Sequence, residues 1–346
     1  MHAGTLLRLC AALLALAAGV ASAAGATPGV SFTHKDWSVD CDNTGTCRAS
    51  GYQRDNDTET VTVLLTRAAG PGAAISAQLQ LGAFSDDAPK PVGTLRMTVA
   101  GHAAGKVDDG TEMTPAQVSA LLKALTGTGE VVFSDGKTRW RLSGDGAAAV
   151  LLKMDDAQGR IGTPGALVKK GTKPEASVPG PVKPPVIQAV RVPAPVEADV
   201  PLALKVLASV PKNDDCDMLA DLQAAKDPDT SDVNLWRLGG GRVLVSAMCW
   251  RAAYNTGSGY WIARDKPPYD AKLVTAVASD FAPDSGTITS SQKGRGVGDC
   301  WGIEDWVWDG HDFVHADQST TGQCRFIVAG GAWQLPTLVS EVRKPR

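Results

Sequence analysis

The stretch Gly294-Arg-Gly-Val-Gly-Asp-Cys-Trp-Gly-Ile-Glu-Asp-Trp-Val-Trp-Asp-Gly-His-Asp-Phe313 holds three of the nine tryptophans of this 346-residue chain, five acids and one cysteine. Ile303–Trp308 is typical of a β-strand, Asp309-Gly310 is a turn pair, and the next predicted strand begins at Phe313. Cys324 lies eleven residues further on and is a candidate partner for Cys300. The stretch therefore predicts antiparallel strands closed by a disulfide.

The rest of the second half repeats this alternation of short strands and turns. Runs of β-branched and aromatic residues are separated by Gly, Pro and Asp clusters, which indicates an antiparallel meander or sandwich. Helices are expected at Leu202–Ala208 and Cys216–Ala225, before these strands. The further predicted strands are Leu235–Leu238, Val243–Trp250, Gly259–Ala263, Lys272–Thr275, Phe313–Ala316 and Cys324–Val328.

Strands and helices are mixed in the first half of the chain. Residues 32–52 predict a hairpin, because Asp42-Asn-Thr-Gly45 is turn chemistry between two alternating segments. Thr114 and Pro115 are a typical N-cap and first helical residue, and a second helix is expected over Ala147–Asp156. We expect an α+β fold that is predominantly antiparallel β. Its further strands are predicted at Val61–Arg67, Ile75–Leu81, Leu95–Val99, Val131–Phe133 and Thr138–Leu142.

A proline-rich segment divides the chain. Eight prolines lie between residues 170 and 201, with few residues around them that can pack. This composition favours a semi-rigid, largely extended linker. The chain length suits two domains. We therefore expect an N-terminal α+β domain over 24–169, the linker over 170–201 and a mainly-β C-terminal domain over 202–346.

The first 23 residues have the pattern of a signal peptide. Arg8 supplies the positive n-region, Ala11–Ala18 is the apolar core, and Ala21-Ser-Ala23 is a small-x-small cleavage site. We expect an exported protein that resides in the periplasm or is secreted from the cell. No later apolar run is long enough to span a membrane, so we expect no transmembrane segment in the mature chain.

Six cysteines remain after the signal peptide, and an oxidising compartment favours their pairing. No Cys-x-x-Cys pair or Cys-His cluster has the spacing of a zinc site, which favours disulfides over a metal. The order of the cysteines leaves other pairings open, but their spacing favours neighbours. The predicted bridges are Cys41–Cys47, Cys216–Cys249 and Cys300–Cys324.

Four stretches resemble a bacterial exported family known as domain of unknown function 1176. They are Phe32–Tyr52, Met154–Thr163, Cys249–Asn255 and the run from Arg295 to Arg325. Trp301 and Phe326 stand where this resemblance leads us to expect glycine or another small residue. The Trp37–Cys41–Cys47 start and the Ser143-Gly144…Ala149 helix entry make the first half distantly similar to invasion-associated locus B-type proteins as well. Neither resemblance implies an activity, a cofactor or a catalytic residue.

Several function classes lack a matching pattern in this sequence. A net charge of −3 and a pI near 6.0 give no overall attraction to nucleic acid. The chain has no Gly-x-Ser-x-Gly nucleophile elbow. His311 and His315 would lie ~13 Å apart along a strand, too far to share one ion. We therefore expect no metal, no cofactor and no nucleic-acid partner.

Trp306 and Trp308 are predicted to project from the same face of their strand. That face is either part of the core or an exposed surface that stacks on sugars or contacts a partner protein. The predicted ligand-binding residues are Trp301, Trp306, Trp308, Asp299, Asp309 and His311.

The predicted function is a non-enzymatic binding or interaction module of the cell envelope, whose partner is an envelope protein or a glycan. An envelope hydrolase is the alternative, because hydrolysis by a pair of carboxylates needs two acids that face each other in a cleft. The carboxylates available near the opening stretch are Asp299, Glu304, Asp305, Asp309 and Asp312.

Overall fold

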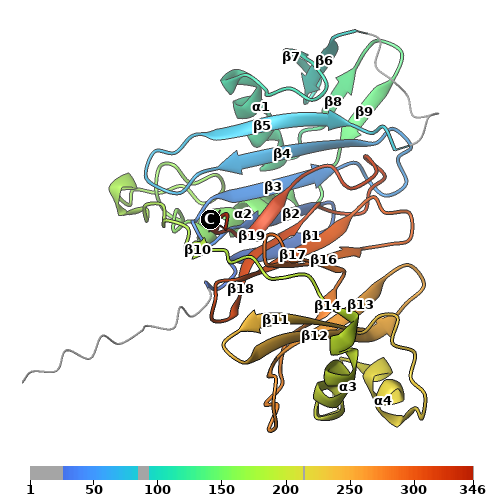
Figure 1. Ribbon diagram of the computed structural model, residues 1–346. Helices are drawn as coiled ribbons and strands as arrows, with labels where there is room; N and C mark the ends of the chain where they lie inside the picture. Colours follow the sequence, from blue (N-terminus) through green and yellow to red (C-terminus); the bar gives the residue numbers. More distant parts are fainter. Residues whose placement is uncertain (1–25, 85–92, 213–214, 346) are drawn as a thin grey trace, which may run out of the picture.

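The computed structural model describes residues 26–84, 93–212 and 215–345 (Figure 1). The predicted signal peptide lies outside these residues. Antiparallel sheets dominate, and the described chain contains four α-helices, which confirms the α+β class. Among the described residues, no helix is both long enough and apolar enough to cross a membrane.

The N-terminal sheet is a five-stranded antiparallel meander in the order β1-β2-β3-β4-β5. Its second hairpin holds the first disulfide, because Cys41 and Cys47 are cross-strand partners whose Cα atoms lie 3.9 Å apart. Asp42 accepts a hydrogen bond from the Thr44 N–H, and Gly45 takes the φ of 88° that this turn requires. The strands are β1 (Val30–His34), β2 (Trp37–Cys41), β3 (Cys47–Tyr52), β4 (Val61–Arg67) and β5 (Ile75–Leu81).

A second sheet, in the order β7-β6-β8-β9, lies next to helix α1 (Pro115–Leu125). Thr114 and Gln117 form a capping box, which satisfies backbone groups at the start of α1. Helix α2 (Ala147–Ala157) packs on β1, β2 and β3, and its apolar side joins Trp37 and Trp140 in one core. The strands of the second sheet are β6 (Leu95–Val99), β7 (His102–Val107), β8 (Val131–Ser134) and β9 (Arg139–Leu142).

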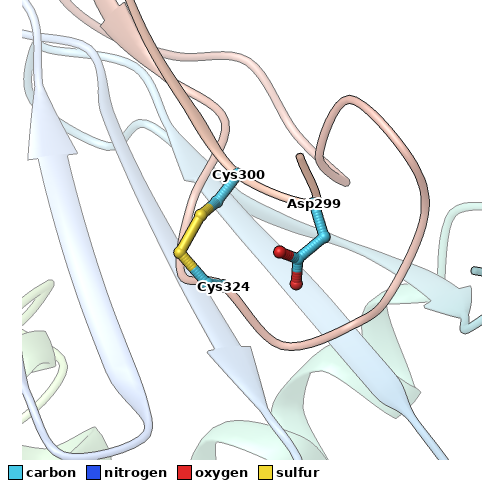
Figure 2. A group of neighbouring side chains, drawn as sticks. All are labelled: Asp299, Cys300 and Cys324. Atoms are coloured by element: carbon cyan, nitrogen blue, oxygen red, sulfur yellow. A yellow bond between two sulfur atoms is a disulfide. The ribbon is translucent and has the colours of Figure 1, made fainter. Parts of the chain in front are cut away.

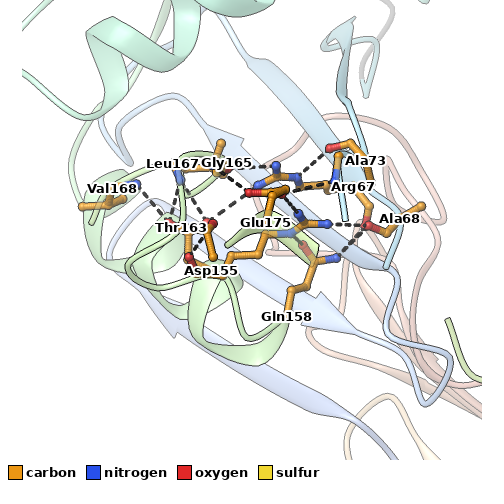
Figure 3. A network of polar contacts seen from close by, with 12 residues as sticks. Arg67, Ala68, Ala73, Asp155, Gln158, Thr163, Gly165, Leu167, Val168 and Glu175 are labelled. Carbon is orange, nitrogen blue, oxygen red and sulfur yellow. Dashed lines mark hydrogen bonds and ion pairs between the residues drawn. The ribbon is translucent and has the colours of Figure 1, made fainter. Parts of the chain in front are cut away.

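Polar side chains attach the end of α2 to the turn between β4 and β5, since Gln158 donates to the Ala68 carbonyl and Arg160 to the Gly70 carbonyl (Figure 3). Arg160 is fully buried and donates to Glu175 at 3.1 Å. Asp155 accepts the Leu167 N–H at 2.7 Å. Because the charged side chains face partners inside the network, the stretch Met154–Thr163 has a structural role.

The proline-rich segment lies along the protein surface and contributes to its packing. It contains two short 3-10 helices, η1 (Glu175–Ser177) and η2 (Glu197–Asp199). Between them β10 (Val186–Gln188) pairs in parallel with β20 (Glu341–Arg343). Ile187 is buried in an apolar cluster with Val307. The segment is therefore held by backbone hydrogen bonds and apolar contacts.

The second half contains two antiparallel sheets, and α3 and α4 pack against the first of them. The Cys216–Cys249 disulfide ties the start of α4 to β12. The first sheet and its helices are α3 (Val200–Ala208), α4 (Asp217–Ala224), β11 (Asn234–Gly239), β12 (Arg242–Arg251), β13 (Thr256–Arg264) and β14 (Lys272–Ala278). The second sheet is β15 (Asp280–Ala282), β16 (Thr287–Lys293), β17 (Trp301–Trp308), β18 (Phe313–Thr320) and β19 (Leu335–Leu338).

The predicted strand over Cys324–Val328 is wrong, because these residues have no regular structure. The place beside β18 is taken by β19 instead. The Phe326 N–H donates to the Asp299 carboxylate, and the Arg325 side chain reaches into the N-terminal half. The apolar composition of this segment predicts pairing with a neighbouring strand. In the structure the segment is held by contacts with the side chains of Asp299 and Asp36 instead.

The C-terminal segment connects the two halves of the chain, and β19 packs against β2 (Figure 1). Tyr52 of β3 lies in a buried cluster with Trp333 and Leu335. Arg325 donates to Asp36 at 2.9 Å. The halves therefore share a buried contact, and the division into two domains remains a prediction.

Candidate binding surface

The loop 294–300 is built around Asp299, which lies beside the Cys300–Cys324 disulfide (Figure 2). The buried Asp299 carboxylate accepts two hydrogen bonds from Arg295, at 2.7 and 2.5 Å, and one from the Phe326 N–H at 2.7 Å. Burial opposes ionisation, but the hydrogen bonds outweigh it and lower the pKa of Asp299. Its oxygens are therefore engaged in holding the loop.

Asp299, Cys300 and Cys324 also lie close together, with their candidate donor atoms within 4.8 Å of one another. The two sulfurs are bonded to each other, and a disulfide sulfur is not the thiolate that binds a metal. The disulfide and the carboxylate together anchor the loop 294–300 to the segment around Phe326. This cluster therefore has a structural role.

Phe326, in the segment to which this loop is anchored, is exposed to solvent. It is 44% exposed, and its φ of 56° is a conformation that bulky residues rarely adopt. The Arg295 guanidinium lies 3.7 Å from the centroid of its ring, and the Phe84 ring meets it edge-on at 5.4 Å. Backbone strain of this kind persists where the surroundings impose it, and it is common at binding sites.

Three further side chains extend the exposed area around the loop. Tyr254 and Val297 are 46% and 52% exposed. The Tyr254 ring packs against Gly296, because a Cβ atom added to this glycine would lie 3.4 Å from Tyr254 Cδ1. Trp301 is half-buried, with Lys293 Nζ 5.5 Å from its ring centroid. We call these residues the aromatic surface: Phe84, Tyr254, Val297, Trp301 and Phe326, with the cations Lys293 and Arg295.

By strand alternation Trp306 and Trp308 share one face of β17, and this face is largely covered. Trp308 is buried, and Trp306 is half-buried with its ring stacked on His315, the centroids 5.0 Å apart. Trp301, the first residue of β17, is five residues before Trp306, so alternation assigns it to the other face of the strand. It lies close to Asp299 in the sequence. The structure therefore separates the candidate tryptophans into two groups.

Asp309 and His311 lie at the other end of β17 from the loop 294–300. Asp309 stabilises the turn into β18 by accepting the N–H groups of His311 and Asp312, at 2.7 and 2.8 Å. Arg242 donates to the backbone carbonyl of His311 at 2.5 Å. Asp309 and His311 thus shape a turn, and the structure does not bring them together with Asp299 and Trp301.

Among the acids of the opening stretch, Asp305 faces a second carboxylate. Asp305 and Asp317 are direct cross-strand partners on β17 and β18. Burial, and less strongly the negative charge of Asp305, raise the pKa of Asp317. Glu304 contacts His315 instead, at 3.1 Å. A carboxyl group of raised pKa beside another carboxyl group is a pattern found in acid–base catalysis.

A family model described as "Protein of unknown function (DUF1176)" matches residues 31–340. The chain belongs to the DUF1176 family. It is also similar to "Uncharacterized protein YpfG" of Escherichia coli (strain K12), with 27% identity over 331 residues that cover 88% of this chain and 90% of the relative. No solved structure matches the chain. The resemblance to domain of unknown function 1176 is confirmed, and the likeness to invasion-associated locus B-type proteins remains a prediction.

In this DUF1176 chain the aromatic surface joins residues that the sequence pattern singles out with others that it misses. Trp301 and Phe326 are the two positions at which the resemblance predicts small residues. Phe84 and Tyr254 come from segments far away in the sequence, so no local spacing connects them to the loop. Val297, an apolar residue between two glycines, is the local signal that points to an exposed contact here.

Proposed function

We propose that this DUF1176 protein is an exported, non-enzymatic interaction module that binds a partner protein through the aromatic surface. The exposed Phe326 at a left-handed φ carries the proposal, because a chain that only needed to turn here could use glycine without strain. Three disulfides support export, since such bonds persist in oxidising compartments such as the periplasm.

The composition of the aromatic surface favours a protein partner over a glycan. Arg295 lies over the Phe326 ring and Phe84 also contacts it, which leaves little flat ring area for a sugar to stack on. Aromatic residues and Arg in one patch are typical of interface hot spots. Lys293 adds a cation beside these rings, and this favours a partner with acidic residues around an apolar socket.

Phe326→Gly should weaken partner binding at least tenfold, since the loss of a central aromatic anchor costs about 2 kcal/mol or more. The fold should persist, because glycine adopts a φ of 56° without strain. A photo-crosslinking amino acid at Val297 would capture the partner in the native envelope. The same probe at Val196, which is 56% exposed, is the matched control.

A protein adduct specific to position 297, and lost in Phe326→Gly, is the expected result. The same adduct from positions 297 and 196, or an adduct unchanged by Phe326→Gly, would contradict the proposal. If proteolysis of the adduct leaves a peptide around position 297 that carries an added mass, and glycosidases remove that mass, the surface is assigned to a glycan instead.

A second candidate function, an envelope hydrolase, is favoured by the Asp305–Asp317 pair. In this reading Asp317 is the proton donor, because its raised pKa keeps it protonated at higher pH than an ordinary Asp. Asp305 is the second carboxylate that glycosidic hydrolysis requires.

If this pair is catalytic, Asp317→Asn should lower kcat by about 100-fold or more. Activity of the unmodified protein should fall as pH rises through the raised pKa of Asp317, because the proton donor is then lost. Hydrolysis of chromogenic glycosides and purified envelope glycan between pH 4 and 8 tests this. Asp312→Asn, at an exposed turn, is the matched control. Absence of hydrolysis by the unmodified protein across this range would eliminate the candidate.

A further inference from the structure

A groove between helix α1 and the β6–β7 hairpin forms a separate candidate site. These elements lie at the top of Figure 1. Its volume is about 650 Å³, and its lining includes Val99 and six alanines. Three of these, Ala116, Ala120 and Ala124, are spaced four residues apart and therefore follow one side of α1. Leu121 of the same helix is buried in the core. The groove is thus a depression walled by small aliphatic side chains.

The groove carries unbalanced positive charge. Lys123 and His102 are the titratable residues in its lining, which includes no carboxylate. Both are exposed, and Lys123 lies in the last turn of α1. An apolar cavity with the Lys123 cation at its rim is complementary to a ligand that has an apolar body and an anionic end.

A neighbouring polar cavity of about 470 Å³ lies across the Gly127-Thr-Gly129 turn and shares that turn with the groove. Its two cations are already ion-paired. Arg54 lies 3.5 Å from Asp145, and Arg141 lies 3.0 Å from Glu130. The attraction for an anion is therefore stronger at Lys123 than in the polar cavity.

We propose that the alanine-lined groove binds a single-chain anionic amphiphile such as a fatty acid. The hydrocarbon chain packs against Ala116, Ala120 and Ala124, where contact with methyl groups removes it from water. The carboxylate lies at the rim and accepts a hydrogen bond from Lys123 Nζ. This site is distinct from the aromatic surface and does not depend on it.

Binding of dodecanoate to the full mature protein, measured by equilibrium dialysis below the micellar concentration, tests the proposal. Ala120→Trp should raise Kd at least tenfold, because the indole fills the groove. Lys123→Met keeps good helix propensity and should raise Kd for dodecanoate at least fivefold. It should leave the binding of uncharged dodecyl maltoside unchanged. Ala176→Trp and Lys183→Met, at exposed sites elsewhere, are the matched controls.

Ala120→Leu provides a milder block if the Trp variant does not fold, and circular dichroism checks each variant. The same Kd for Ala120→Leu and Ala176→Trp would overturn the proposal. Equal affinity for dodecanoate and dodecyltrimethylammonium would also overturn it, since the rim charge would then have no role. Phe326→Gly should leave dodecanoate binding unchanged, so failure here is distinguishable from failure of the partner-binding function.

Discussion

Arg325→Met is expected to lower the free energy of unfolding by about 3–5 kcal/mol, because it leaves Asp36 as an unpaired, largely buried charge. Arg325 is 9% exposed at the contact between the two halves of the chain. Its guanidinium donates to Asp36 at 2.9 Å and also to Asp55 and to the Gln53 carbonyl. Methionine retains much of the packing of the aliphatic stem but none of these hydrogen bonds.

Guanidinium chloride unfolding of the oxidised protein, followed by tryptophan fluorescence, measures this loss. Arg264→Met is the matched control, because Arg264 pairs with Asp270 at 3.1 Å and both side chains are more than half exposed. The control should lose less than about 1 kcal/mol. Adding Asp36→Asn to Arg325→Met should recover part of the loss. If Arg325→Met costs no more than the control, the ion pair does not stabilise the contact between the halves.

Asp40→Asn is expected to raise the free energy of unfolding by about 2–3 kcal/mol at pH 7.5. Asp40 is buried on β2, and one of its carboxylate oxygens has no hydrogen-bond partner. Burial raises the pKa of Asp40 from 3.8 to about 6, against a smaller opposing effect of the Ser31 hydroxyl. Ionised Asp40 therefore costs the folded state about 3 kcal/mol above pH 6. An amide of the same shape carries no charge and avoids this cost.

The pH dependence of the stability difference shows whether the buried charge of Asp40 is its cause. The unfolded chain ionises Asp40 first, so its contribution to stability is fully present below pH 3.8 and is lost as pH rises to about 6. The two proteins should therefore have similar stabilities near pH 4 and diverge up to pH 6. Denaturant unfolding at four values between pH 4 and 7.5, with Asp312→Asn as the control, measures the difference. A difference that does not change with pH would contradict the prediction.

Local patterns predict most elements of this fold, because the interactions behind them lie within a few residues. The turn Asp42–Gly45 and the N-cap Thr114 are confirmed, as are the three disulfides between neighbouring cysteines. The strand predicted over Cys324–Val328 is wrong, since long-range partners such as Asp36 and Asp299 determine the course of the backbone there.

The candidate surface is less predictable than the fold. Trp301 is recognisable as an unusual residue, but Tyr254 and Phe84, which contribute to the same aromatic surface, are distant from it in sequence. Alternation along β17 assigns Trp306 and Trp308 to one face. Whether that face contacts solvent depends on the residues that cover it, and Trp308 is buried with Ile288 and Phe281.

The amino-acid sequence by itself determined the position of most strands and helices, the disulfide framework and membership of the DUF1176 family. These properties depend on short-range spacing and on motifs that can be read in order. Only the tertiary structure decided which side chains reach the surface, because burial depends on contacts between distant segments. Tyr52 against Trp333 closes the contact between the halves, and Arg295, near the start of the opening stretch, lies against the exposed Phe326 ring.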